Sequence, residues 1–267
     1  MKTIKVQCPA KINLTLKIVS KRKDGFHNIE SIMQTINLYD YLDITVIESD
    51  RTKIILDGNS DEIPYDKTNL VYKAAELFLN SNKLKNYEIH VFIEKNIPVS
   101  AGLAGGSTNG AGMLFALNKV FNNIMNDEEL NTLCAKLGSD LNFCLKGGRA
   151  ITRGRGEILE PKEFRQLNIN LIKPVDLGIS AKEAYTSFAK KTLTDNNRYS
   201  RREFVNDLEW AIIDKYPELR VIKKKYPTSV MTGSGSTYFS TREEFKQEYG
   251  YWIKNGLTTI PDGIKIV

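Results

Sequence analysis

The chain has 267 residues, of which 41% are hydrophobic and 26% charged, a composition typical of a globular protein and not of a disordered or fibrous one. No apolar run approaches the ~20 residues that a membrane span requires, and the N-terminal residues show no signal-peptide pattern, so a cytoplasmic protein without a membrane partner is expected. The formal net charge of +6 is not gathered into a recognisable nucleic-acid-binding module, and we expect no nucleic acid partner.

Cysteine and histidine usage restricts the chemistry further. Cys8, Cys134 and Cys144 are widely separated and odd in number, which argues against a disulfide framework or a thiolate metal site and predicts three buried, reduced side chains. His27 and His90 are the only histidines, which nearly excludes a site built from several histidines.

The first part of the chain predicts strands followed by helices. Residues 2–8 and 12–19 alternate in hydrophobicity, and Asp24-Gly25 predicts a turn. The later patterns predict strands over 43–49, 53–56 and 87–94, helices over 69–80 and 127–137, and a hairpin over 147–159. A further helix is expected after a loop over 98–108, with Ala111, Leu114, Leu117 and Val120 on its apolar face. In the strand 87–94, His90 shares its face with Glu88 and Glu94 and is expected on the solvent side.

The remaining residues alternate between the two kinds of element. The patterns predict a strand over 169–173, a helix over 181–189, a loop over 193–200, a helix over 201–215, strands over 229–231 and 237–239, and a helix over 243–254 followed by short strands. A boundary near residues 159–165 would divide the chain into domains of residues 1–160 and 161–267.

A glycine-rich loop between a strand and a helix is the clearest chemical signal. It reads Pro98-Val-Ser-Ala-Gly-Leu-Ala-Gly-Gly-Ser-Thr-Asn109. Glycines let the backbone turn toward a ligand and present N–H groups at a helix N-terminus, where the helix dipole favours phosphate. The spacing fits neither a Walker loop nor a dinucleotide fingerprint. A tight turn with only a structural role remains the alternative.

Two further segments carry polar residues in apolar surroundings. Lys11 and Asn13 lie two residues apart and therefore on one face of a strand, where a solvated edge is the plainer interpretation. Asp140 follows the helix 127–137, where an aspartate usually caps a helix.

Taken together and in order, these segments resemble the GHMP kinase superfamily over essentially the whole chain. The segments are Pro9-Ala-Lys-Ile-Asn-Leu14, Lys23-Asp-Gly-Phe-His27, the glycine-rich loop, Leu137-Gly-Ser-Asp140 and Met231-Thr-Gly-Ser-Gly235. Within the superfamily the sequence is most similar to the 4-diphosphocytidyl-2-C-methyl-D-erythritol kinases, because the stretch that ends at His27 is typical of that group. The resemblance implies an α+β fold, with an N-terminal domain like ribosomal protein S5 domain 2 and a ferredoxin-like C-terminal domain.

The same resemblance implies a role for each site residue. Lys11 and Asp140 would be the catalytic pair, while Asn13, Phe26, His27 and Tyr185 would contact the substrate. The residues expected to bind ATP are Lys95, Pro98, Val99, Ser100, Ala101, Gly102, Leu103, Ala104, Gly105, Gly106, Ser107 and Thr108. The cytosine ring would lie between the rings of Phe26 and Tyr185, with His27 at its edge.

The implied reaction is transfer of a phosphoryl group from ATP, with Mg²⁺, to a hydroxyl of the cytidyl alcohol. Asp140 would accept the hydroxyl proton, and Lys11 would keep Asp140 ionised. Ser107 and Thr108 could cap the helix or contact phosphate and Mg²⁺. The metal ligands stay open, and the chain is expected to be a monomer or a homodimer.

Departures from the family pattern leave alternatives. Ala104 and Ser100 stand where the family usually has glycine, and a positive φ at position 104 would cost about 1 kcal/mol or more with alanine. The alternatives are another small-molecule kinase of the superfamily and a weakened nucleotide-binding paralogue. At single positions, His27 could be a structural turn histidine and Lys95 a surface lysine.

Overall fold

A large mixed sheet forms the base of the molecule in the computed structural model, which describes residues 1–193 and 205–267. Its strands lie in the order β11 (Lys265–Ile266), β1 (Lys2–Lys21), β2 (His27–Glu48), β4 (Tyr87–Glu94) and β3 (Lys53–Gly58). The hairpin of β5 (Arg149–Arg153) and β6 (Ile158–Pro161) pairs with β2. The pairing of β3 with β4 is parallel, and the other pairings are antiparallel.

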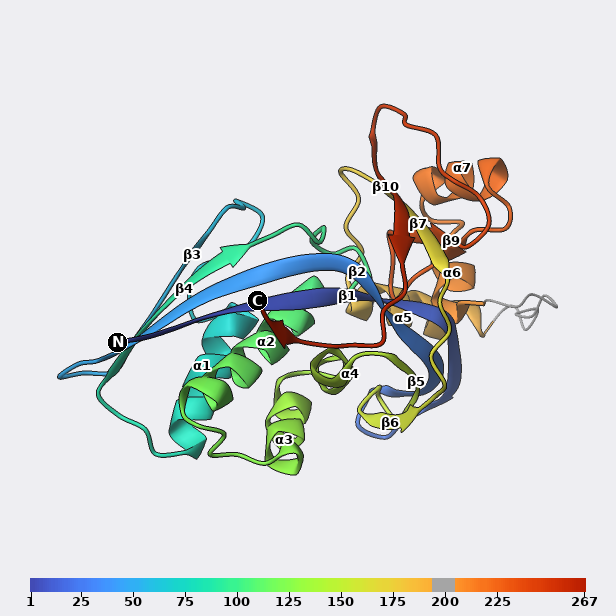
Figure 1. Ribbon diagram of the computed structural model, residues 1–267. Helices are drawn as coiled ribbons and strands as arrows, with labels where there is room; N and C mark the ends of the chain where they lie inside the picture. The colour runs from blue at the N-terminus through green and yellow to red at the C-terminus, as the bar shows by residue number, and fades with distance from the viewer. Residues whose placement is uncertain (194–204) are drawn as a thin grey trace.

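Two long, bent strands dominate this sheet (Figure 1). The sequence predicted separate strands over 2–8 and 12–19, but β1 runs through both because three irregularities absorb the break at Pro9. These shifts, between Pro9 and Lys11, between Asn13 and Thr15 and between Ile18 and Ser20, bend the strand without ending it. Likewise the strand predicted over 43–49 is the end of the much longer β2. The turn at Asp24-Gly25 is confirmed, with Gly25 at φ +85°.

Four helices cover one face of the large sheet (Figure 1). They are α1 (Leu70–Ser81), α2 (Gly105–Val120), α3 (Asp127–Leu137) and α4 (Leu141–Lys146). The predicted helices agree closely, because α1 begins after the capping Asn69 and α3 after Asn126, which forms a capping box with Glu129. The six-residue α4 was not predicted, being too short to show a helical period.

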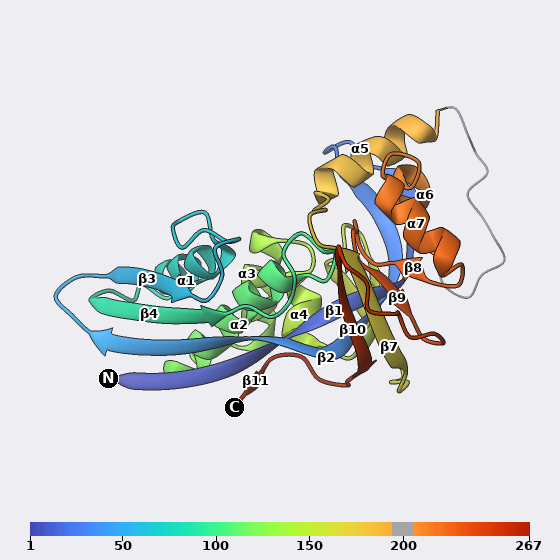
Figure 2. The same cartoon turned by 90° about the horizontal axis from the view of Figure 1, so that it is seen from above.

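The second half forms a smaller antiparallel sheet in the order β10 (Tyr251–Thr258), β7 (Asn168–Pro174), β9 (Tyr238–Ser240) and β8 (Val230–Met231). This is the strand order of a ferredoxin-like fold. The helices α5 (Ala181–Lys191), α6 (Asp207–Ile212) and α7 (Pro217–Lys225) pack on one face of it (Figure 2). Its other face packs against β1 and β2 through Ile12, Ile36 and their neighbours. The α+β fold class is thus confirmed.

The helix predicted over 243–254 was wrong. Residues 241–250 are irregular, and β10 follows, because Gly250 at φ +85° and the run Tyr251-Trp-Ile253 favour a turn and then a strand. The side chain of Asn255 bonds the backbone N–H and C=O of Phe245 at 3.1 and 2.8 Å, which holds this segment in its irregular course. Of the helix predicted over 201–215, only α6 is present in the described part, and residues 201–204, like 194–200 of the predicted loop, lie outside it.

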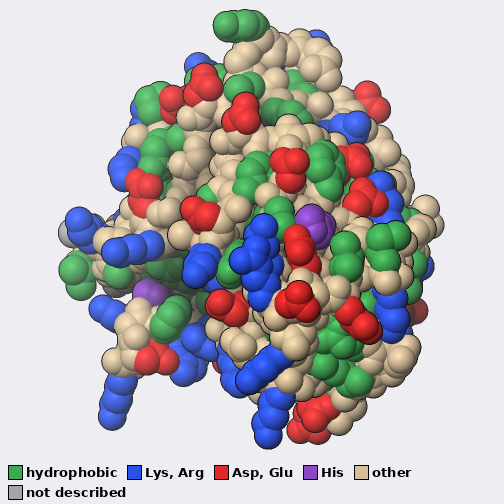
Figure 3. Space-filling view, turned by 90° about the vertical axis from the view of Figure 1, so that its left-hand side faces the viewer, with side chains coloured by type: hydrophobic (Ala, Val, Ile, Leu, Met, Phe, Trp, Pro, Cys, Tyr) green, Lys and Arg blue, Asp and Glu red, His purple; other side chains and the backbone are tan. Residues whose placement is uncertain are grey.

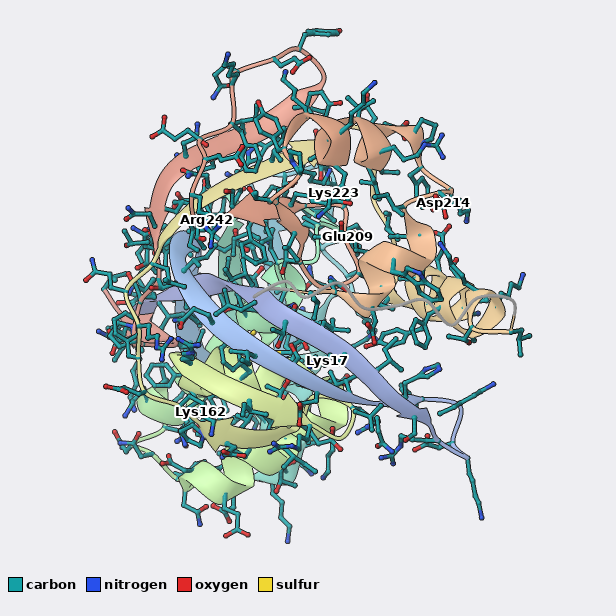
Figure 4. All side chains as sticks on the ribbon, turned by 90° about the vertical axis from the view of Figure 1, so that its right-hand side faces the viewer. Lys17, Lys162, Glu209, Asp214, Lys223 and Arg242 are labelled. Carbon is teal, nitrogen blue, oxygen red and sulfur yellow. The ribbon has the colours of Figure 1, made fainter. Side chains whose placement is uncertain are left out.

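An ion pair links two helices of the second half. Figure 4 shows Glu209 and Lys223 directed toward one another between α6 and α7, with 2.8 Å between carboxylate and ammonium.

Cys8, Cys134 and Cys144 are buried and unpaired, as expected, and burial raises the thiol pKa of Cys134 to about 12. Among residues 1–193 and 205–267, every helix is too short or too polar to cross a bilayer.

Candidate active site

A cavity of about 1050 Å³ lies between the two halves of the molecule. It is lined by the glycine-rich loop, the start of α1, the middle of β1, the turn between β1 and β2, one face of α5 and the turn of the β5–β6 hairpin. The lining contains the carboxylate of Asp140 and five basic residues: Lys11, Lys21, Lys95, Arg155 and Lys182. A lining with this excess of basic side chains attracts an anion. The face of the molecule in Figure 3, by contrast, has acidic and basic side chains interspersed.

The glycine-rich loop ends where α2 begins, with its helix N-terminus in the cavity. The first N–H groups of a helix have no partner within it, and here the N-cap residue Ala104 supplies no side-chain hydrogen bond to them. Gly105, Gly106 and Ser107 all line the cavity. The start of α2 can therefore bind phosphate oxygens through backbone N–H groups and the helix dipole.

Two residues of this loop have a left-handed backbone although they are not glycines. Ala104 has φ +60° and Ser100 has φ +50°, so the departures that the sequence showed fall at positions that favour glycine. Gly102, at φ +75°, is tightly packed, since a Cβ there would lie 2.1 Å from the carbonyl oxygen of Thr232. The loop is therefore seated directly on the Thr232–Gly235 turn of the second half.

Of the predicted loop residues, nine line the cavity and two do not. The nine are Pro98, Val99, Ser100, Ala101, Gly102, Ala104, Gly105, Gly106 and Ser107. Leu103 and Thr108 are fully buried instead. The Thr108 hydroxyl points into the interior, where it has no hydrogen-bond partner among the described residues, so it neither caps α2 nor faces the cavity.

Lys11 is a buried cation at the centre of the site, with 3% of its surface exposed. Its ammonium donates to Oδ1 of Asn13 at 2.7 Å and to the carbonyl oxygen of Gly102 at 3.1 Å, and lies 3.5 Å from Oδ2 of Asp140. The Asn13 amide in turn donates to Oγ of Ser31 at 2.7 Å. The solvated-edge interpretation of this strand is therefore wrong, and Asn13 fixes the position of Lys11.

Asp140 occupies the N-cap position of α4 but makes no capping hydrogen bond with its side chain. The carboxylate lines the cavity with 30% of the side chain exposed. The helix-cap interpretation therefore does not account for this residue. Lys11 lies beside it, so the two oppositely charged side chains form a pair at the wall of the cavity.

Lys95 is not the surface lysine that one interpretation allowed. Only 6% of its side chain is exposed, and its ammonium forms an ion pair with the fully buried Asp40 and a 3.2 Å hydrogen bond to Oδ1 of Asn109. A Cβ on Gly105 would come within 2.9 Å of that ammonium. Lys95 thus packs against the first turn of α2 and also lines the cavity.

The opposite end of the cavity is aromatic. The rings of His27 and Tyr185 are stacked with centroids 5.2 Å apart and planes at 16°, and Phe26 is half exposed nearby. Burial lowers the pKa of His27 from its usual 6.5, with a smaller effect of Lys21, and burial raises the pKa of Tyr185. Both side chains are therefore neutral near pH 7, suited to stacking and hydrogen bonding with a planar ring.

Some lining residues were not predicted to be site residues. They are Ile63, Pro64, Thr68, Asn69 and Leu70 at the start of α1, and Lys21, Ser139, Arg155 and Lys182 around the aromatic end. Of these residues, Arg155 had the clearest local pattern, because it lies between two glycines in the run Arg153-Gly-Arg-Gly156.

Comparison with known proteins agrees with this geometry. Residues 69–148 match the model of the GHMP kinases N terminal domain. A 4-diphosphocytidyl-2-C-methyl-D-erythritol kinase of Clostridium acetobutylicum is 38% identical over 93% of this chain and 94% of its own length. One from Fusobacterium nucleatum is 34% identical over 98% and 95%. The chain belongs to this family of GHMP kinases.

Solved structures of GHMP kinases share the fold. A crystal structure of 4-(cytidine 5'-diphospho)-2C-methyl-D-erythritol kinase has a TM-score of 0.75 at 26% identity, covering 96% of this chain and 99% of its own. A homoserine kinase of Cytophaga hutchinsonii has a TM-score of 0.73 at 17% identity, covering 100% and 98%, which shows the fold alone. The GHMP kinase fold expected from the motifs is thus confirmed.

Proposed function

We propose that this chain transfers the γ-phosphoryl group of ATP to the 2-hydroxyl of 4-diphosphocytidyl-2-C-methyl-D-erythritol, a step of the non-mevalonate route to isoprenoid precursors. The observation that carries the proposal is a single cavity that holds an uncapped helix N-terminus, the Lys11–Asp140 pair and a stacking aromatic end. The first suits a triphosphate, the second a hydroxyl, and the third a pyrimidine.

The proposed mechanism rests on positioning and charge. In a loose phosphoryl-transfer transition state, most of the catalysis comes from aligned groups and electrostatic stabilisation. Asp140 accepts the proton of the attacking hydroxyl as transfer proceeds. Lys11 holds that carboxylate and the Gly102 carbonyl in one arrangement, so the base and the phosphate loop keep a fixed separation.

The residues present fit a Mg²⁺ ion that is held mainly by phosphate oxygens. Among the described residues there is no cluster of three or more His, Cys, Asp or Glu, while the Asp140 carboxylate and the Ser107 hydroxyl both line the cavity. Mg²⁺ usually takes one or two protein ligands besides substrate phosphates and water. We propose that the Ser107 hydroxyl would hold it together with phosphate oxygens and water, where it would neutralise phosphate charge, and that the Asp140 carboxylate stays the proton acceptor. A cytoplasmic location and a monomer or homodimer complete the proposal.

The test is ADP release with the purified chain, ATP and alternative acceptors. We expect slow release with ATP alone and rapid release when the cytidyl alcohol is added. Mevalonate and homoserine are the controls, since other GHMP kinases of this fold act on them. Equal rates with all three acceptors would overturn the assignment, and no rate with any of them would support a nucleotide-binding paralogue.

A further inference from the structure

The β5–β6 hairpin carries two arginines that face opposite ways, one at the end of β5 and one in the turn. Arg153 is on the outer side, where its guanidinium pairs with Glu160 at 2.6 Å and with Glu30 at 3.3 Å. Arg155 lines the cavity. Between and after them, Gly154 at φ +69° and Gly156 at φ +125° take backbone conformations that favour glycine, and they turn the chain so that Arg155 points inward.

Arg155 is held in place by an aromatic ring. Its guanidinium carbon lies 5.1 Å from the ring centroid of Phe26, a cation–π contact. Its ion pair with Glu157 is long, with 3.9 Å between Nε and Oε1, and the other oxygen of Glu157 accepts the backbone N–H of Arg155 at 2.6 Å. The N–H groups of the guanidinium fork are therefore oriented but only weakly engaged.

The turn that carries Arg155 lies between the Asp140 carboxylate and the aromatic end of the cavity. A Cβ on Gly156 would lie 3.4 Å from Ser139 and 3.8 Å from Oδ1 of Asp140, so the turn closely approaches the carboxylate. On its other side Arg155 contacts Phe26. An acceptor with a base at the aromatic end and a hydroxyl at Asp140 would pass its linking diphosphate across this turn.

We propose that the Arg155 guanidinium binds the diphosphate of the acceptor and thereby selects acceptors that carry one. This inference rests on the proposed function for the direction in which the acceptor lies. The chemistry is independent of it, because a planar guanidinium donates two parallel N–H bonds to phosphate oxygens, and such charge-assisted bonds are stronger than neutral ones. The cation–π contact preorganises the fork, so less side-chain freedom is lost on binding.

The test compares the affinities for cytidine 5'-diphosphate and cytidine, measured by calorimetry with a non-hydrolysable ATP analogue saturating the nucleotide end. The wild-type chain should bind the diphosphate more tightly than the nucleoside. Arg155→Gln should reduce that preference by about 10-fold or more, the usual size of a lost hydrogen bond to a charged group. Arg155→Lys should keep part of it, because the charge stays while the fork is lost.

Arg153→Gln is the matched control, since it removes an arginine from the same hairpin on the outer side, and it should leave the preference unchanged. If Arg155 only supported the Phe26 ring, Arg155→Gln would weaken both ligands equally, and the unchanged ratio would overturn the proposal. Absence of any preference in the wild type would overturn it too. Failure of the proposed function is a separate result, seen as no ADP release by the wild-type chain with the cytidyl alcohol. Melting temperatures show that each variant is folded, and Arg155→Lys serves if Arg155→Gln is not.

Discussion

Lys11 shows at the scale of one residue how the sequence motifs become a site. A lysine and an asparagine two apart predicted only a shared strand face, whereas the structure joins them to Gly102 and to Asp140. The resemblance to the family was enough to predict that Lys11 and Asp140 belong to the site. Their distance, the missing cap at Asp140 and the buried partner Asp40 of Lys95 could not be predicted, because each depends on contacts between distant segments.

Asp140→Asn should lower kcat by about 10²–10⁴-fold while ATP still binds, because asparagine keeps the shape but cannot accept a proton. The carboxylate makes no capping bond, so the melting temperature should change little. Single-turnover rate, ATP affinity and melting temperature on one preparation measure all three.

Lys11→Ala is the companion variant. It should also lower kcat, and the double variant should be far from additive if the two groups act as one unit. An Asp140→Asn protein that melts early and keeps its turnover would instead show that the residue has a structural role.

Ala104→Gly should raise the free energy of unfolding by about 1 kcal/mol, because glycine adopts the left-handed backbone at φ +60° without the clash of a Cβ. ATP affinity should rise or stay the same. Thermal melting and calorimetric ATP titration check both. Ala135→Gly, within the regular helix α3, is the control and should destabilise by roughly 0.5–1 kcal/mol. A large loss of ATP affinity in Ala104→Gly would mean that the loop depends on the methyl group.

The affinity for the cytidyl substrate should fall as His27 becomes protonated. Its pKa lies below the ordinary 6.5, so the imidazole is neutral at pH 7 and can accept a hydrogen bond from the base. KM should be constant between about pH 7 and 8 and rise below about pH 6. The shift also means that, below pH 6.5, the folded state binds fewer protons than the unfolded one, so the associated stability is present above 6.5 and is lost as pH falls from there through the lower pKa of the folded state. A His27→Asn protein that keeps the same pH dependence of KM would exclude His27 as its source.

At the scale of elements, the predicted bounds agreed with the structure where the local sequence marked both the type of element and its ends. The strand over Tyr87–Glu94 and the helix over Asp127–Leu137 have the bounds that were predicted, because strict alternation marks the first and a capping box the second. Residues 243–254 have helix-forming glutamates and lysines, yet the Asn255 contacts and pairing with β7 decide against a helix. Tertiary contacts outweighed local propensity there.

The aromatic end joins two such elements, the turn after β1 and the helix α5. Phe26→Ala and Tyr185→Ala should each raise KM for the cytidyl substrate by roughly 5- to 150-fold and spare ATP affinity, since stacking on a base contributes ~1–3 kcal/mol. Steady-state kinetics with each substrate varied in turn measures this. Tyr249→Ala, a fully exposed aromatic outside the cavity, is the control. A normal KM in Tyr185→Ala would mean that another ring covers the base.

At the scale of the molecule, the division into domains at residue 160 stays a prediction. Contacts cross this position in both directions. The distal half of β1 packs in the core of the second half through Ile18, whose N–H donates to Asp207 at 2.7 Å. In return β11 pairs with β1 in the large sheet. The sequence predicted two domains, and no local pattern in it indicated that β1 and β11 connect the two halves.

The two halves should therefore unfold in one cooperative transition. Ile18→Ala should destabilise it by about 2–5 kcal/mol, as for other buried large-to-small changes. Ile44→Ala, in the core of the first half, should lower the same transition. Fluorescence of Trp210 and Trp252 reports on the second half, and hydrogen exchange in α1 and α3 reports on the first. Loss of the tryptophan signal at a lower temperature than the exchange protection would show that the halves are independent.

The packing of β1 against the second half also affects how the chain folds during synthesis. Ile18 and its acceptor Asp207 are 189 residues apart, and a ribosome adds about 5–20 residues per second. For roughly 10–40 s, then, the distal half of β1 exists without α6, which carries Asp207 and packs on it in the finished fold. During that interval this strand is an apolar segment open to chaperones or to a neighbouring nascent chain, so the yield of folded enzyme in a cell depends on how fast translation covers these residues as well as on the stability of the finished fold.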